Sequence, residues 1–159
     1  MKIIFLGCFI FCIKLFGAVG IPVTYMEEYW RYTVLIQGKN SYCSGVIIDR
    51  DAILTAKHCM QPMNPQHQLG EVKFGVPFRE NWKWQSTISI KSFALLENKD
   101  LAVILLEGTI PEDFKSINLY HSIRLIKGMT GYLLGFGKLN KNIPDHLRKS
   151  KVEIYSLDT

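Results

Sequence analysis

Residues 42–59 read YCSGVIIDRDAILTAKHC, and this stretch is the most informative part of the chain. A cysteine and an apolar run come first, then a turn containing Asp49 and Asp51, a second apolar run, and a histidine followed at once by a cysteine. Two short apolar runs around a polar turn predict a β-hairpin. A lone histidine is more often structural than catalytic, so the meaning of His58 and Cys59 depends on partners elsewhere.

The first twenty residues have the composition of a secretory signal. Lys2 precedes an apolar run at 3–13, and the small residues Ala18 and Gly20 have the spacing that signal peptidase requires. A membrane anchor is the alternative, but crossing a bilayer takes about 20 apolar residues, and Lys14 interrupts this run. We therefore expect cleavage after Gly20 and a secreted, extracellular protein.

Removal of residues 1–20 leaves 139 of the 159 residues, enough for one domain. A two-barrel all-β domain is longer, at roughly 200 to 250 residues. The removal also takes two lysines and lowers the formal net charge from +5 to +3. No long basic run and no basic stripe interleaved with aromatic residues remains, so we expect no nucleic-acid partner. We also expect no membrane association once the signal has been removed.

Four cysteines are present, and Cys8 and Cys12 leave with the signal. Cys43 and Cys59 remain in a compartment where thiols oxidise, which predicts one disulfide between them. Closing a loop of this length stabilises the fold by about 3 kcal/mol in the chain-entropy account.

A zinc site is the alternative for these cysteines, with Cys43, His58, Cys59 and His67 as the available ligands. Adjacent residues such as 58 and 59 point apart on an extended chain, and no CxxC or HxxxH spacing accompanies them. We therefore expect no bound metal, and nothing in the sequence indicates another cofactor.

Short apolar or alternating runs separated by turn residues are typical of a small all-β barrel or sandwich. One group of runs lies at 33–37, 45–49, 52–56, 71–76, 86–93 and 100–107, and a second group begins at 131–137 and 150–155. The segment 108–123 reads as a connector between the groups. We place a domain boundary near residue 118.

The stretch at 42–59 resembles the chymotrypsin/trypsin family of serine proteases (peptidase family S1). In that family an early disulfide joins a cysteine before a Gly-rich strand to the cysteine directly after the catalytic histidine. The matching positions are Cys43, Gly45, Thr55, Ala56, His58 and Cys59. NKDLAVILLE at 98–107 resembles the segment of the catalytic aspartate, and GFG at 135–137 resembles the family's Gly-Trp-Gly.

The resemblance covers residues 21–159 and implies a double Greek-key β-barrel. The first barrel, at about 30–117, would be complete, and the second, at about 118–159, only begun. It also implies that His58 is the general base and that Asp100 accepts the Nδ1 proton of its imidazole. The Cys43–Cys59 disulfide would then hold the loop that carries His58, and the substrate would be a protein or peptide.

The chain departs from the family at several positions. Its 159 residues contain no Gly-Asp-Ser-Gly-Gly motif, so the nucleophilic serine and the oxyanion hole that accompanies it are absent from them. The segment that selects the substrate is missing too, so the sequence predicts no preference for the residue before the cleaved bond. Signal cleavage would expose Ile21, Pro22 and Val23 instead of Ile-Val-Gly-Gly. Lys57 replaces a residue that is often small, and Gly131 one that is often cysteine.

These departures leave two main hypotheses. The chain is either the front part of a secreted serine endopeptidase, inactive as it stands, or a non-catalytic homologue that binds a protease, an inhibitor or another protein. An unrelated secreted β-domain with a structural His-Cys pair is a third alternative. The strands of the second group are expected to lack neighbours and to offer a surface to a protein partner. Their apolar residues are Tyr132, Leu134, Phe136, Val152 and Ile154.

Overall fold

The computed structural model describes residues 20–38, 41–61, 69–78, 81–119, 127–136 and 146–153. The expected signal lies outside the described residues except for Gly20, as do His67 and Ile154. Within the described ranges, no helix is long and apolar enough to cross a membrane.

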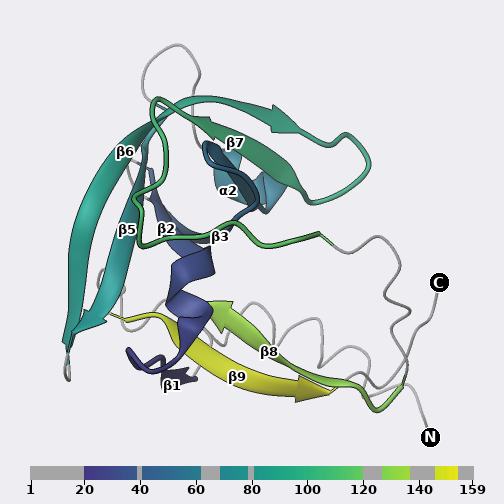
Figure 1. Ribbon diagram of the computed structural model, residues 1–159. Helices are drawn as coiled ribbons and strands as arrows, with labels where there is room; N and C mark the ends of the chain where they lie inside the picture. The colour runs from purple at the N-terminus through teal and green to yellow at the C-terminus, as the bar shows by residue number, and fades with distance from the viewer. Residues whose placement is uncertain are drawn as a thin grey trace, which may run out of the picture.

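Six antiparallel strands close into a barrel in the order β2-β3-β4-β7-β6-β5 (Figure 1). Closure gives every strand two hydrogen-bonded neighbours. The fold is therefore all-β, as predicted, although β3 begins earlier and β6 is longer than the sequence runs indicated. The strands are β2 (Thr33–Gln37), β3 (Tyr42–Ile47), β4 (Ala52–Thr55), β5 (Glu71–Phe78), β6 (Asn81–Leu95) and β7 (Ala102–Leu106).

The core consists of buried aliphatic residues with an aromatic cluster. Val34, Leu35 and Ile36 on β2 are fully buried. Phe114, from the segment after β7, packs edge-on against Phe74 of β5 with ring centroids 5.0 Å apart. Phe114 also packs edge-on against Trp30, which lies on the short 3₁₀ helix η1 (Glu28–Tyr32). The segments before and after the barrel strands therefore contribute to the same core.

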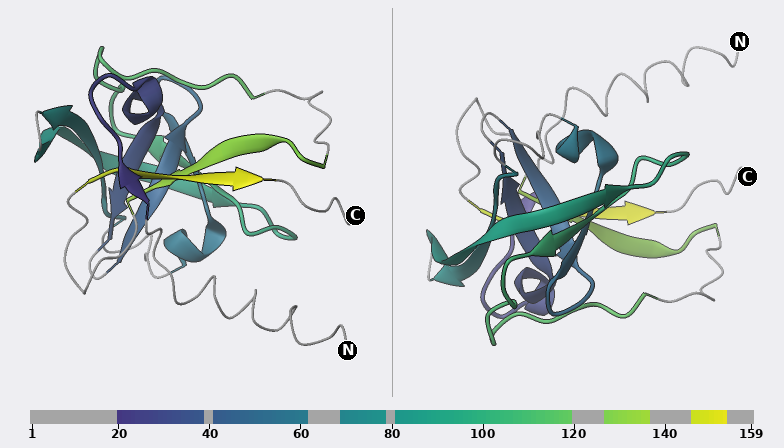
Figure 2. Two further views of the ribbon diagram at one scale, coloured as in Figure 1. Left: turned by 90° about the horizontal axis from the view of Figure 1, so that it is seen from below. Right: turned by 90° about the horizontal axis from the view of Figure 1, so that it is seen from above.

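A second, three-stranded sheet lies beside the barrel, in the order β1-β9-β8 (Figure 2). It is formed by β1 (Ile21–Pro22), β8 (Thr130–Gly135) and β9 (Arg148–Glu153). The β8–β9 hairpin was expected, but the pairing of β1 with β9 was not. Among the described residues, β8 pairs only with β9, so this sheet is open where the barrel is closed.

Phe136, directly after β8, connects the sheet to the barrel. We expected this side chain in a second-barrel core or on a strand without a partner. It is instead buried against Trp82 and Trp84 of β6, with ring centroids 5.4 and 5.6 Å away. Its backbone N–H also donates a hydrogen bond to the Ser44 hydroxyl on β3, at 3.0 Å. Phe136 therefore belongs to the interface between the two sheets.

Candidate active site

Strand register brings the two residues of the candidate site together. β4 and β7 are antiparallel neighbours, and Thr55 at the end of β4 lies opposite Ala102 at the start of β7. The chain that leaves β4 and the chain that enters β7 therefore meet at one rim of the barrel. His58 follows Thr55 by three positions and Asp100 precedes Ala102 by two, so both arrive at this rim.

His58 and Asp100 make two hydrogen bonds with each other. The imidazole Nδ1 lies 2.7 Å from Asp100 Oδ2, and the backbone N–H of His58 donates to Asp100 Oδ1 at 2.9 Å. The side chains of His58 and Asp100 therefore face each other, as expected. With Nδ1 engaged, Nε2 is the ring nitrogen left for proton transfer. The site is open, because 66% of the His58 side chain and 59% of the Asp100 side chain are exposed.

Hydrogen bonding favours the ionised form of Asp100. The pKa of its carboxyl lies below the ordinary value, first because the His58 backbone N–H donates to it and next because the imidazole does. Partial desolvation acts in the opposite direction, and the positive charge of protonated His58 adds a smaller lowering. Asp100 is therefore a carboxylate at neutral pH, which is the form that accepts the Nδ1 proton and fixes the tautomer.

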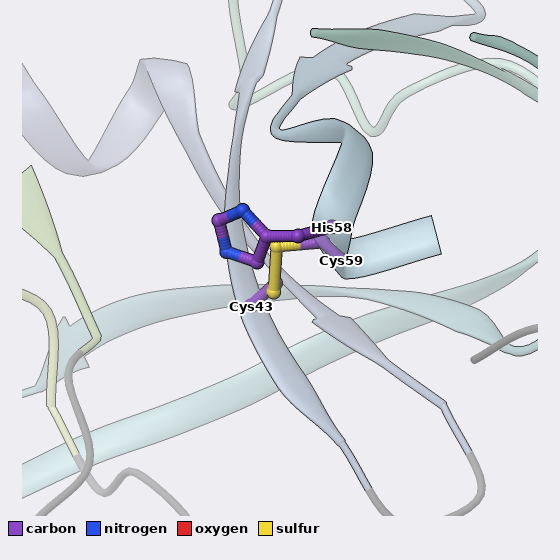
Figure 3. A group of neighbouring side chains, drawn as sticks. All are labelled: Cys43, His58 and Cys59. Carbon is purple, nitrogen blue, oxygen red and sulfur yellow. A yellow bond between two sulfur atoms is a disulfide. The ribbon is translucent and has the colours of Figure 1, made fainter. Parts of the chain in front are cut away.

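The predicted disulfide is confirmed. Cys43 on β3 and Cys59 are bonded, with their Cα atoms 6.0 Å apart, and the bond lies beside the His58 ring (Figure 3). His58 and Cys59 both belong to the short helix α2 (Lys57–Met60), so the expectation that residues 58 and 59 lie on an extended chain was wrong. The disulfide joins this helix to β3 and restricts the backbone that carries the imidazole.

The geometry around Cys43, His58 and Cys59 bears on the metal alternative. Side chains on a helical turn do not point apart as they do on a strand, and the ligand atoms of Cys43, His58 and Cys59 lie within 4.8 Å of one another. The two sulfur atoms are bonded to each other, however, and it is the thiolate that ligates metal. In this oxidised form the group offers one effective ligand, the imidazole.

Lys57 is a contributor to the site that sequence reasoning missed. The sequence shows Lys57 only as a departure from a position that is often small in the family. Its ammonium donates hydrogen bonds to the backbone carbonyls of Leu96 and Glu97, each at 3.2 Å. Both acceptors lie on the loop that leads to Asp100. A long cation next to the candidate histidine was the available signal in the sequence.

Ser44, on β3, makes hydrogen bonds to two other parts of the fold. Its hydroxyl accepts the Phe136 N–H, and its carbonyl accepts the hydroxyl of the buried Thr55. Among the described residues, the side-chain partner of the imidazole is Asp100 and not a serine. The described part of the site therefore pairs an imidazole with a carboxylate.

Comparison with protein families decides the relationship. The family model described as Trypsin matches residues 20–159. The chain belongs to the trypsin family. Among the solved structures similar to this trypsin-family chain is a double mutant of human heparin-binding protein, with a TM-score of 0.69 and 20% sequence identity. The match covers 88% of this chain and 67% of that chain, and at this identity it shows the fold. Comparison with curated proteins finds no match.

Proposed function

We propose that the His58–Asp100 pair is the acid–base part of a serine-type endopeptidase centre that cleaves protein or peptide substrates. The observation that carries this proposal is the 2.7 Å contact between Nδ1 and Oδ2, made at a barrel rim in a trypsin-family chain. The nucleophilic serine would be contributed by a segment outside the 159 residues, in a longer form of the protein.

Each residue has a defined task in this mechanism. Nε2 of His58 takes the proton of the serine hydroxyl as its oxygen attacks the scissile carbonyl, and later passes that proton to the departing amine. Asp100 remains ionised, holds the Nδ1–H tautomer and stabilises the imidazolium that forms in between. The Cys43–Cys59 disulfide limits movement of the helix that carries the base. An oxyanion hole would come with the nucleophile segment and would contribute about 2.7 to 4 kcal/mol per donor.

Secretion is part of this proposal. Residues 1–20 have the pattern of a cleaved signal, and a disulfide persists in oxidising compartments. Mass spectrometry of protein recovered from the culture medium tests it, with an N-terminus at Ile21 as the expected result.

The first experiment is to sequence the transcript beyond the codon for Thr159 and to express the longer product. An in-frame Gly-Asp-Ser-Gly-Gly segment is expected, and a fluorophosphonate probe should label its serine. His58→Ala should abolish labelling, and Asp100→Asn should lower kcat by about 10⁴-fold, because the amide can donate to Nδ1 and favour the wrong tautomer. Labelling that persists in His58→Ala would refute the assigned base.

The 159-residue chain alone should show no serine-protease turnover. Mature protein would be incubated with a panel of peptide esters and with the fluorophosphonate probe. Covalent labelling of any of its own serines, lost in His58→Ala, would contradict this expectation and would identify an unconventional nucleophile.

A non-catalytic binding function is the second candidate. It is favoured by apolar side chains that are exposed on the second sheet, with Tyr132 at 50%, Leu133 at 58% and Val152 at 42%. The name of the structurally similar human protein also refers to binding, of heparin. This candidate predicts that no transcript carries an in-frame nucleophile segment and that the short product accumulates outside the cell. A longer transcript encoding the serine motif would exclude it.

A further inference from the structure

Lys57 binds the start of the loop that carries Asp100, whereas His58 binds Asp100 near the end of that loop. This loop runs from Leu96 to Leu101 and is closed by the Leu96 N–H, which donates to the Leu101 carbonyl at 3.0 Å. The Lys57 ammonium binds the carbonyls at the start of the loop, Leu96 and Glu97. His58, the next residue of α2, binds the carboxylate near its end. Two neighbouring residues of one helix thus fasten both ends of one short loop.

Because His58 and Asp100 are exposed, the hydrogen bonds from Lys57 to their loop can help to hold the pair together. An ion pair or hydrogen bond between exposed side chains contributes little, because water competes and both side chains lose conformational freedom. His58 and Asp100 are such a pair, each more than half exposed. Holding the loop backbone in advance reduces the freedom that Asp100 loses when it engages His58.

The donors and acceptors suit the task. A lysine ammonium offers three N–H donors and can bind two adjacent carbonyls at once. Hydrogen bonds from a charged donor are stronger than neutral ones. A small side chain at position 57 could not reach the loop. The backbone N–H of Lys57 adds the smallest of the contributions that lower the pKa of Asp100.

We propose that Lys57 is a positioning residue that preforms the His58–Asp100 pair by fixing loop 96–101 to α2. The inference deepens the proposed function, on which the catalytic meaning of the pair rests. Its structural content, that the loop is held by the Lys57 side chain, can be tested without any turnover.

Lys99 provides a matched control. It lies on the same loop and is exposed, and no hydrogen bond or ion pair of its side chain occurs in the described part of the chain. Lys57→Met and Lys99→Met each remove one positive charge near Asp100, but only the first removes hydrogen bonds to the loop. Lys57→Arg keeps both the charge and several donors.

The experiment measures the pair by NMR in mature protein and in these variants. One readout is hydrogen exchange of the His58 amide, which donates to Asp100, and the other is the titration of the Asp100 carboxyl carbon. In Lys57→Met the amide should exchange about tenfold faster, the effect expected when hydrogen bonds from a charged group are lost. The pKa of Asp100 should move up toward its ordinary value. Lys57→Arg should restore both readouts substantially, and Lys99→Met should change neither.

Equal effects of Lys57→Met and Lys99→Met would show that charge and not attachment is responsible, and would overturn the proposal. No effect of Lys57→Met would overturn it as well. If Lys57→Met does not fold, Lys57→Gln is measured instead, because its side chain is too short to bind both carbonyls. Failure of the longer product to label with fluorophosphonate would refute the proposed function and leave these NMR results standing.

Discussion

The closed barrel and the open second sheet use similar residues with different results. Strand β2 reads TVLIQ, and four of its five residues are buried. Strand β8 reads TGYLLG, and four of its six residues are exposed. Residues that favour β-structure make up three of the five in β2 and two of the six in β8, and each strand also contains leucine. The difference is that β2 has a neighbour on each side, whereas β8 pairs only with β9 in the described part of the chain.

Closure therefore decides burial here more than composition does. A barrel wraps one face of each strand around a shared interior, while an open sheet needs another layer to cover it. Gly131 on β8 illustrates the open case, because a side chain built at its Cα would meet nothing within 4 Å. Four experiments test this contrast.

The largest expected effect is on local opening. Amides of barrel strands β2 and β4 should exchange only through global unfolding, which for a domain requires about 5 to 15 kcal/mol. Amides of β8 should exchange with far less protection, and limited proteolysis should cut within 127–153 before it cuts within the barrel. NMR exchange and mass spectrometry of the fragments measure both. Equal resistance of the two regions would show that the short form is a self-sufficient domain.

Phe136→Ala tests the contact that couples the regions. Removing a fully buried phenylalanine lowers stability by about 3 to 5 kcal/mol, and here it would leave Trp82 and Trp84 without their shared partner. Leu133→Ala on the exposed side of β8 is the matched control and should change stability by about 0.5 kcal/mol or less. Urea unfolding followed by tryptophan fluorescence measures both. Similar losses of stability in the two variants would mean that the Phe136 contact contributes no more to stability than an exposed position of β8.

Removing the disulfide tests the barrel by itself. The double variant Cys43→Ser, Cys59→Ser should lose about 3 kcal/mol, because the unfolded chain is no longer constrained over 16 positions. The denaturant concentration at the midpoint of barrel unfolding should decrease. Elemental analysis of the parent protein should find no stoichiometric zinc. Two free thiols in secreted parent protein, detected by alkylation and mass spectrometry, would contradict the bond itself.

The smallest expected effect is a pH dependence confined to the second sheet. Glu27, before η1, pairs with Lys149 on β9, and the hydrogen bond from Lys149 is the main reason why the pKa of Glu27 is lowered from 4.5. Stability from a lowered carboxyl pKa is present above about pH 4.5 and is lost as pH falls through the folded value. The protection factor of the Val23 amide, which donates to the Leu147 carbonyl, should decrease in that window. Glu27→Gln should remove the dependence, and a barrel amide should not show it.

Much of the fold and of the candidate site could be predicted because these features depend on short stretches of the sequence. Alternating apolar runs marked most strands, and the His-Cys pair with Asp100 at the head of an apolar run marked the candidate site. The disulfide could be predicted because two cysteines remain once the expected signal has been removed. These features depend on short-range periodicity or on residue identity, which a single sequence displays.

The missed features depend on contacts between distant single residues. Strand β1 has two residues, and nothing local in Ile21–Pro22 predicts pairing with β9. Predicting the burial of Phe136 would require knowing where Trp82 and Trp84 lie, and these residues belong to a strand far away in the sequence. The helical turn at His58 was mistaken for a strand end because one turn is too short to show a period.

The register of β4 against β7 also has a consequence for modularity. His58, Asp100, Lys57 and the disulfide all lie between Tyr42 and Leu106, within a single closed barrel. The acid–base half of the proposed centre is thus a contiguous cassette whose residues come from the closed barrel and its rim, and not from the second sheet. Such a cassette is suited to fragment complementation, in which one polypeptide carries the base and a separately expressed one carries the nucleophile. Activity would then report the docking of two halves, and the open second sheet would be the surface on which they meet.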